Sequence, residues 1–165
     1  HTVPAGHADS YPLDMLAEVL NERTGRLSTG LIEGRGIAAV ANASSDTRKY
    51  AGLFAVAAQA RGEAPPEALE AAWYEELAKL QDREVPEREL RKVKNRVAAG
   101  NYRRLESNMS LFIQLAFSEM ILDWREINEA PARYEAVTAA DIRRVARKYF
   151  DPTNRSVAIY RRKAN

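Results

Sequence analysis

The sequence predicts an α+β domain in two layers, in which helices cover a mostly antiparallel sheet. Two short apolar runs, residues 37–43 and 53–60, are separated by a polar connection, as in neighbouring antiparallel strands. Most of the remaining chain has apolar residues at helical spacing. A final run, residues 156–160, places Val157 and Ile159 on one face and predicts a last strand. The order strand, helix pair, two strands, helices and strand is typical of this fold class.

Length and composition limit the possible functions. The 165 residues suffice for one domain with its own core, so we expect residues 1–165 to form a single domain. The net charge of +2 gives no reason to expect nucleic acid or an anionic membrane as a partner. The absence of cysteine excludes disulfides and thiolate chemistry, and no apolar run is long enough to span a membrane. The first residues lack a signal peptide and an initiator methionine, so we interpret the chain as a processed product or an excised piece.

The first half of the chain predicts two helices before the strand pair. His1–Val3 is a candidate truncated strand that Pro4 stops. Asp9 or Ser10 can cap the helix that follows, and Gly25 ends the turn after it. The buried stripe of that helix consists of Leu13, Leu16, Ala17 and Leu20. A second, short helix is predicted from Leu27, Leu31 and Ile32.

The second half predicts mainly helices. Pro66 starts one whose apolar side holds Leu69, Trp73, Leu77 and Leu80. Pro86 opens the longest, about 30 residues or roughly 45 Å, with a possible kink at Gly100–Asn101. Its apolar side is expected to hold Leu90, Val93, Val97, Leu105, Met109, Phe112 and Ile113. Further helical pieces are expected at 119–129 and from Pro131.

The last helix has the clearest boundaries. Thr138 and Asp141 form a near capping box at its start, with Asp where Glu or Gln is usual. Asp151-Pro152 stops it. Its buried stripe is expected to consist of Ile142, Val145, Ala146 and Tyr149.

Several segments, in this order and spacing, resemble the C-terminal domain of the insulinase-like (pitrilysin-type) zinc peptidases. They are Thr-Val-Pro-Ala-Gly-His-Ala-Asp near the start, Gly-Arg-Leu…Leu-Ile-Glu…Gly-Ile-Ala-Ala from Gly25, Glu-Arg-Glu-Leu-Arg-Lys-Val-Lys from Glu87, and Val-Thr-Ala-Ala-Asp-Ile…Ala-Arg-Lys-Tyr-Phe-Asp-Pro from Val137. The resemblance covers nearly the whole chain. In that family two similar α/β domains lie side by side in one half-molecule, and two halves close around a peptide.

The resemblance also implies what this chain lacks. The family's zinc motif, H-x-x-E-H, belongs to the first domain, where two histidines bind the metal and the glutamate activates water. Here the only histidines are His1 and His7, and neither lies in such a motif. We interpret them as a strand residue and a loop residue. We therefore expect no catalytic, cofactor-binding or metal-binding residue in this chain, with zinc bound by a missing N-terminal domain.

A second family element is an Arg and a Tyr, seven positions apart, that contact substrate. Aligning Leu31 and Gly36 with that element places Ile32 at the Arg position and Ala39 at the Tyr position. Neither side chain can donate a hydrogen bond to a peptide carbonyl. Among bacterial two-subunit members of the family, this local sequence resembles that of the second domain of the zinc-bearing subunit.

The resemblance thus implies a supporting half of a zinc endopeptidase that hydrolyses peptides. The expected partners are the sister N-terminal domain of the same chain, a homologous partner subunit or second copy, and a peptide substrate. Such proteins are often periplasmic. One alternative is a non-catalytic scaffold or partner subunit, like the core subunits that the family contributes to respiratory complexes. Another is a free-standing small-ligand domain. The residues upstream of His1 distinguish the first two.

Other residues have both a functional and a plainly structural interpretation. Glu33 and Arg35 could face a chamber or form a solvated pair. The charges at 103, 104 and 106 could contact the sister domain or only solvent. Core or interdomain packing is expected for Trp73, Tyr74, Phe112, Phe117 and Trp124. The basic tail, Arg161–Lys163, is interpreted as a solvated terminus.

Overall fold

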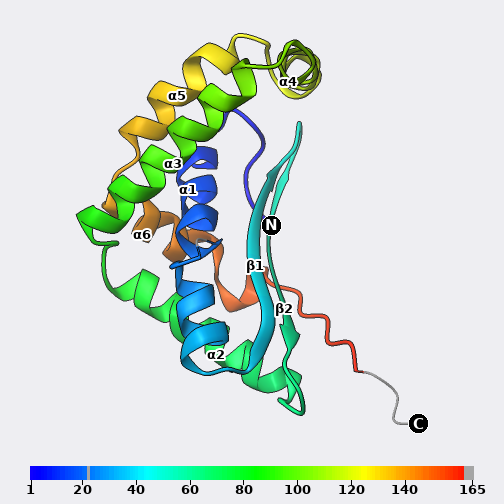
Figure 1. Cartoon of the computed structure of the whole chain (residues 1–165), viewed down its shortest axis with the longest axis vertical. Coiled ribbons are helices and arrows are strands. Elements are labelled where there is room, and N and C mark those ends of the chain that lie inside the picture. Colours follow the sequence, from blue (N-terminus) through cyan, green and yellow to red (C-terminus); the bar gives the residue numbers. More distant parts are fainter. Residues whose placement is uncertain (22, 162–165) are drawn as a thin grey trace.

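One β-hairpin forms the sheet layer and helices cover one of its faces, as Figure 1 shows for the computed structural model. The structure describes residues 1–21 and 23–161. Within them the sheet has two antiparallel strands, β1 (Ala38–Thr47) and β2 (Gly52–Ala60). The predicted α+β class with helices over an antiparallel sheet is therefore confirmed, with a sheet of two strands in the described part.

The hairpin has one covered and one open face. Ala43 lies opposite Val56, and Ser45 lies opposite Phe54, so these side chains share the face toward the helices. Phe54 packs edge-on against Phe150, with ring centroids 4.8 Å apart. On the other face Val40 is exposed. The antiparallel pairing is as predicted, but β1 extends through residues 44–47, which were expected to be a connection.

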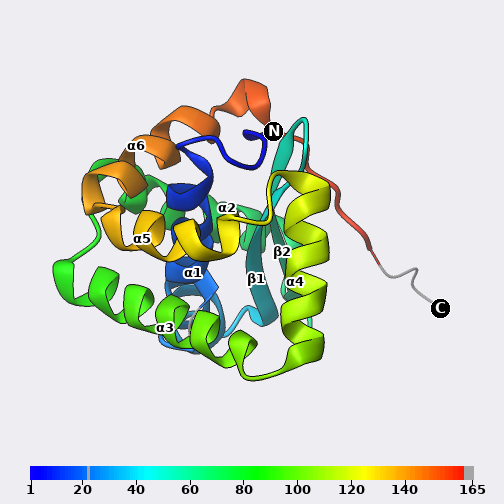
Figure 2. The same ribbon diagram turned by 90° about the horizontal axis from the view of Figure 1, so that it is seen from above.

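Helix α1 (Ser10–Asn21) is the centre of the core. It contacts β1, α3, α5 and α6, and Figure 2 shows it surrounded by the other elements. Its predicted stripe is buried, with Leu13, Leu16 and Leu20 fully inaccessible. Neither expected cap acts through its side chain in the predicted way. The Ser10 hydroxyl donates to the His7 carbonyl, and the Asp9 carboxylate turns toward α6.

The next helix is a π-helix, η1 (Ser28–Gly34), that buries Leu31. It confirms the predicted short helix. The hairpin follows, and then α2 (Pro66–Asp82) starts at the predicted proline and buries Leu69, Leu77 and Leu80.

The predicted long helix is wrong. Two helices, α3 (Glu87–Leu105) and α4 (Asn108–Ile121), replace it, and they meet at a sharp corner (Figure 2). The break lies at Ser107, where the backbone is extended. The Ser107 hydroxyl caps α4, because its oxygen accepts a hydrogen bond from the Ser110 N–H at 3.3 Å. Gly100, where a kink was expected, lies inside α3. A glycine at helical dihedrals weakens a helix but does not end it.

The predicted pieces at 119–129 and from Pro131 are also wrong. Helix α4 ends at Ile121, and α5 (Glu126–Ala136) begins four residues after Leu122 with Pro131 in its interior. A proline there removes one hydrogen bond of the helix. Contacts of α5 with α1, α3 and α4 stabilise the helix on both sides of Pro131.

The last helix, α6 (Ala139–Tyr149), is confirmed with its capping box. Thr138 Oγ1 accepts from the Asp141 N–H, and the Asp141 carboxylate accepts from the Thr138 N–H, both at 3.1 Å. A short 3₁₀ turn, η2 (Pro152–Asn154), follows.

The predicted last strand is not formed. Residues 156–160 carry no strand pairing, and Val157 and Ile159 are exposed. A strand needs a neighbour for its backbone groups, and none lies beside this run among the described residues. At the other end, Thr2 makes a single bridge to Gly52, so the truncated first strand is one residue pair long.

Candidate docking surface and cleft

Helix α4 presents apolar side chains to solvent on several sides. None of its side chains is buried, although all 14 of its residues are described. We define the α4 surface as the exposed large apolar residues on this helix and directly after it. Their exposed fractions range from 37% at Leu115 to 67% at Met109, and they are Met109, Phe112, Ile113, Leu115, Phe117, Met120, Leu122 and Trp124.

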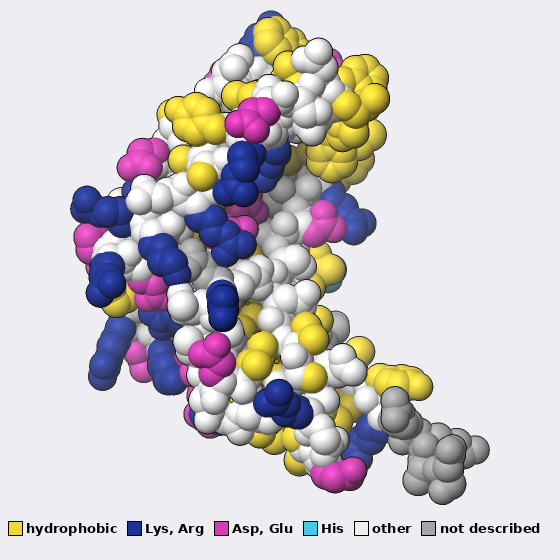
Figure 3. Space-filling model, in the orientation of Figure 1, with side chains coloured by type: hydrophobic (Ala, Val, Ile, Leu, Met, Phe, Trp, Pro, Cys, Tyr) yellow, Lys and Arg dark blue, Asp and Glu magenta, His cyan; other side chains and the backbone are white. Residues whose placement is uncertain are grey.

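The α4 surface is a continuous patch. Figure 3 shows apolar side chains gathered at the upper right, where Figure 1 places α4, while charged side chains dominate the left of the molecule. Only one stripe of α4, Ser110, Gln114 and Ser118, is polar, so its apolar side is wider than an ordinary surface helix needs to face one core. Contiguous apolar patches on soluble domains mark interaction sites.

A cleft of about 970 Å³ lies between this helix and the body of the domain. Its wall includes side chains from α1, β1, the end of α3, α4 and α5. Ile113, Phe117 and Leu122 belong both to the cleft and to the α4 surface. The two features are therefore one continuous region.

A partly buried acid, Asp14, lies in the cleft wall. The Tyr134 hydroxyl donates to Asp14 Oδ2 at 2.7 Å. Burial raises the pKa of Asp14 above its ordinary value, and the bond from Tyr134 offsets only part of this. Burial and the nearby Asp14 charge raise the pKa of Tyr134. The pair links α1 to α5.

A second polar group joins the same helices. The Tyr11 hydroxyl donates to Glu126 Oε1, and Arg133 Nη1 donates to the Tyr11 oxygen at 2.6 Å and to Glu126 Oε2 at 2.8 Å. Burial, with the bond to Glu126, raises the pKa of Tyr11 to about 12. These bonds join Tyr11 of α1 to Glu126 and Arg133 of α5, so the set explains how α5 is held against α1.

The two histidines lie in separate local contacts. His7 Nδ1 accepts from the Asp9 N–H at 3.0 Å, in the turn before α1. The His1 amino group donates to Asn154 Oδ1 at 3.2 Å. Among residues 1–21 and 23–161, no three His, Cys, Asp or Glu side chains are grouped so that they could hold a metal ion. The described residues therefore do not fit a zinc site.

Ile32 and Ala39 also lie apart from the cleft. Ile32 is in η1 and packs against the core, and Ala39 is exposed in β1. Neither contributes to the cleft wall. The assignment of these positions to a missing Arg/Tyr pair stays a prediction.

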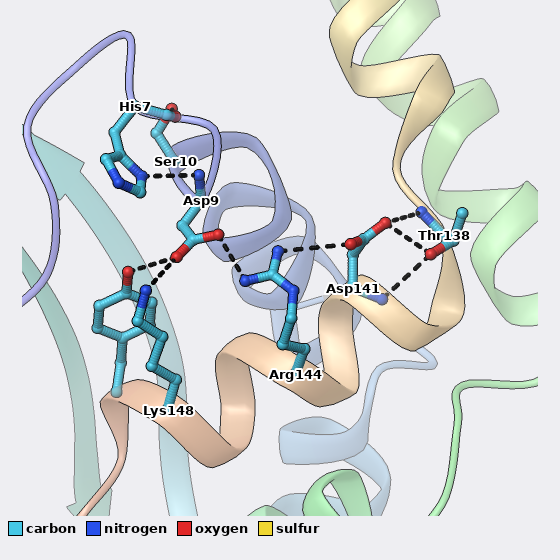
Figure 4. A network of polar contacts seen from close by, with 8 residues as sticks. His7, Asp9, Ser10, Thr138, Asp141, Arg144 and Lys148 are labelled. Atoms are coloured by element: carbon cyan, nitrogen blue, oxygen red, sulfur yellow. Dashed lines mark hydrogen bonds and ion pairs between the residues drawn. The ribbon is translucent and has the colours of Figure 1, made fainter.

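An ion cluster fixes the C-terminal helix against α1 (Figure 4). Asp9, which is 4% exposed, accepts from Arg144 at 2.6 Å, from Lys148 at 2.8 Å and from the Tyr149 hydroxyl. Burial alone would raise the pKa of Asp9, but the hydrogen bonds from Lys148, Tyr149 and Arg144 hold it well below its ordinary value. Arg144 also pairs with Asp141 of the capping box.

The other candidates have local partners. Arg35 forms an ion pair with Glu75 of α2, and Glu33 is exposed. The charged residues 103, 104 and 106 are exposed at the end of α3. Arg161 is exposed and pairs with Glu67, whereas Arg162 and Lys163 lie outside the described residues.

The aromatic set divides in two. Trp73 is half-buried against Phe150, with centroids 6.1 Å apart, and Tyr74 lies beneath the Arg155 guanidinium. The aromatic members of the α4 surface, in contrast, are outside the core. The periodicity treated Met109, Phe112 and Ile113 as a buried stripe, which is wrong. Interdomain packing, the other interpretation given for Phe112, Phe117 and Trp124, stays a prediction. A signal was present, since the apolar residues of 109–121 occupy most of the circumference of a helix, and the one polar stripe is Ser110, Gln114 and Ser118.

The sequence profile of the peptidase M16 inactive domain matches residues 1–97. The chain belongs to the peptidase M16 family. The predicted family resemblance is therefore confirmed, and the match is to the family's inactive domain. No curated protein matches the chain.

Solved structures share the fold of this M16 domain. A protease from Helicobacter pylori superposes with a TM-score of 0.86 at 22% identity, covering 93% of this chain and 37% of its own. The inactive peptidase domain of a candidate zinc protease from Bordetella parapertussis has a TM-score of 0.84 at 20% identity, covering 94% and 85%. The periplasmic protease PqqL from Escherichia coli has a TM-score of 0.71 at 15% identity, covering 90% and 16%. The M16 domain thus spans only a small part of the longer chains.

No helix in the described part of this M16 domain is long and apolar enough to cross a bilayer.

Proposed function

We propose that this chain is the C-terminal, non-metal domain of a zinc-dependent endopeptidase that hydrolyses peptides. Its own role is structural: it docks against the catalytic domain and forms part of the wall around the peptide. Zinc and the water-activating glutamate belong to the N-terminal domain of the parent chain. The periplasm is the proposed compartment, supported by the name of the E. coli neighbour.

The α4 surface carries this proposal. A domain that buries its core around α1 but leaves its most apolar helix outside needs another body to cover that helix. The proposed occupant is the other half of the parent chain. In the H. pylori protease the matching region is 37% of the chain, so most of that chain lies outside the fold and is available to pack against it.

The position of the cleft supports the same occupant. Because three residues belong both to the cleft and to the α4 surface, one partner can fill the cleft mouth and cover the helix together. Arg103 and Arg104 line the same cleft and are exposed. An acidic rim on the partner would complement them.

The experiment separates the two halves of the parent protein. The upstream half and this chain are produced separately, and their affinity is measured by calorimetry. We expect association, zinc in the upstream half only, and hydrolysis of a fluorogenic peptide only by the mixture. Phe112→Gln and Phe117→Gln should each weaken association about tenfold or more, because apolar anchors dominate interfaces.

A matched control distinguishes docking from general surface effects. Tyr160 is 90% exposed and lies far along the chain from α4, so Tyr160→Gln should leave the affinity unchanged. Circular dichroism checks that each variant folds. Absence of association contradicts the proposal. So does a stable dimer of this chain alone that Phe112→Gln dissociates, because then a second copy covers α4.

A non-catalytic scaffold is the second candidate, favoured by the apolar residues at positions 32 and 39. It predicts association of the two halves without zinc or hydrolysis. An upstream half without H-x-x-E-H would support it.

A further inference from the structure

Asp14 has fewer hydrogen-bond donors than Asp9, the other shielded acid of α1 and the turn before it. Asp9 accepts from three side chains of α6. Among the described residues, only the Tyr134 hydroxyl donates to Asp14 with normal geometry, and it bonds to Oδ2. Asp14 lines the cleft. Its second carboxylate oxygen, Oδ1, can therefore accept from a donor that enters through the cleft.

A second polar group beside Asp14 also lacks a partner. Ser45 of β1 lines the same cleft, and its hydroxyl lies close enough to Asp14 to lower the pKa of that acid. Nevertheless, Ser45 Oγ is buried and makes no hydrogen bond of normal geometry within the part of the chain that the structure describes. A buried hydroxyl without a partner costs free energy. The polar groups on this side of the cleft are therefore incompletely satisfied in the isolated domain.

The charges around Asp14 favour a cation. Burial, and then the charge of Glu18 one turn along α1, raise the pKa of Asp14. Arg96 lies 3.6 Å from Glu18, but none of the Lys, Arg or His side chains that the structure describes forms an ion pair with Asp14. The ionised acid thus lowers the stability of the isolated domain. Groups that cost stability are typical of sites that serve binding or activity.

We infer that Asp14 accepts a lysine ammonium group of the upstream half of the parent chain, which enters the cleft when that half docks on α4. The inference rests on the proposed function, which makes the upstream half the body that covers the α4 surface. An ammonium fits better than a guanidinium, because Tyr134 occupies Oδ2 and no free pair of carboxylate oxygens is left for a planar fork. The three ammonium donors can use Oδ1 and, after rotation about χ1, Ser45 Oγ.

The cleft suits a lysine in size and in lining. Its volume of about 970 Å³ leaves room for one long side chain and for part of the segment that carries it. On the α4 side, Ile113, Phe117 and Leu122 are apolar and can pack against the lysine stem while the ammonium reaches Asp14. Arg103 and Arg104 line the cleft as well, so the lysine is expected among acidic neighbours on the partner.

Calorimetry of the two separately produced halves tests the role of Asp14 in binding. Asp14→Asn should weaken association at pH 7 about tenfold or more, because the ammonium loses its counter-ion. The isolated variant should keep or exceed the thermal midpoint of the parent chain. Ser45→Ala should weaken association about threefold. Asp46→Asn is the matched control, because Asp46 is the next residue of β1, pairs with Arg48 and does not line the cleft, so the affinity should stay unchanged.

Acetylation identifies the lysine. Acetic anhydride is applied to the free upstream half, to its complex with this chain and to its complex with the Asp14→Asn chain, both complexes at saturating concentration, and mass spectrometry locates the modified lysines. One lysine of the upstream half should react about tenfold more slowly in the first complex than in the free half, because the ion pair keeps its amine protonated. It should regain reactivity in the Asp14→Asn complex. Replacing that lysine by glutamine should weaken association as Asp14→Asn does, and the two losses should not add.

The outcomes separate this inference from the proposed function. Association that Phe112→Gln weakens and Asp14→Asn does not overturns the lysine contact and leaves the docking of α4 intact. Absence of association overturns both. A lower thermal midpoint of the isolated Asp14→Asn variant shows a structural role for the charge and overturns the inference. Unchanged association, with a raised KM of the Asp14→Asn complex for lysine-containing peptides only, assigns the contact to the substrate and overturns the assigned source.

Discussion

The side chain of Asn21 forms a closed pair of hydrogen bonds with the backbone of Ala43. Its Nδ2 donates to the Ala43 carbonyl oxygen, and its Oδ1 accepts from the Ala43 N–H, both at 2.6 Å. Asn21 is the last residue of α1, so the pair joins the central helix to the edge of the sheet. It acts as a one-residue strand and blunts that edge against further pairing.

Asn21→Ala should destabilise the domain by about 1–3 kcal/mol, because Ala43 is buried and both its backbone groups lose their partner. Urea unfolding measures the change. Asn42→Ala is the control, since the neighbouring Asn42 is exposed, and it should cost less than about 0.5 kcal/mol. Equal losses in the two variants would show that the cap contributes nothing specific.

Asp9 should make stability depend on pH at the acid end. Its folded pKa is depressed, so its contribution is complete above the ordinary value of 3.8 and is lost as the pH falls through the folded value. Asp9→Asn should cost about 1–3 kcal/mol at pH 7, and the difference from the parent chain should shrink below about pH 4. Unfolding curves from pH 7 to pH 2 test this, and a difference that stays constant with pH contradicts it. The exposed pair of Asp46 with Arg48 is the control, and Asp46→Asn should cost at most about 1 kcal/mol.

Asp14 should have the opposite effect. Its folded pKa is raised, so its ionised form opposes folding at neutral pH, and this penalty fades as the pH falls through the folded pKa toward 3.8. Asp14→Asn keeps an oxygen that accepts from Tyr134 but removes the charge. The variant should equal or exceed the parent in stability at pH 7, and any gain should vanish near pH 3. Tyr134→Phe should instead be destabilising, because it leaves the acid without its donor. A loss in Asp14→Asn at pH 7 would mean that the charge itself is stabilising.

Ile32→Arg and Ala39→Tyr test the positions where the family's substrate-contacting pair is expected. Ile32 packs against the core, so Arg there should cost about 1–3 kcal/mol. Ala39 is exposed, so Tyr there should be nearly neutral. Neither variant, nor the double variant, should hydrolyse a fluorogenic peptide as an isolated domain. Hydrolysis by the double variant alone would refute the two-domain assignment.

Periodicity predicted the parts of the fold whose local signals agree with their burial. The buried sides of α2 and α6 are narrow stripes, so they could be recognised from spacing alone. In α1 the predicted stripe is buried, but Tyr11, Met15 and Val19 outside it are buried too, because other elements surround this helix. The Thr138 capping box fixed the start of α6 within a residue. The hairpin followed from two apolar runs of suitable length.

Local sequence signals gave wrong predictions where contacts with another segment determine the secondary structure or the burial. Residues 87–121 are continuously helix-favouring, and only the weak cap at Ser107 separates α3 from α4. The run 156–160 has a strand pattern but no neighbour among the described residues. Spacing misled in α4, because its polar stripe, Ser110, Gln114 and Ser118, is partly buried while the wide apolar side is exposed.

The corner at Ser107 makes α4 a separable part of the domain. Short connections attach it at both ends, at 106–107 and 122–125, and it contributes no buried side chain to the core. If α4 docks as proposed, substitutions along it should change partner affinity and leave the fold intact. Grafting α4 from a relative should then exchange binding partners while keeping the rest of the domain.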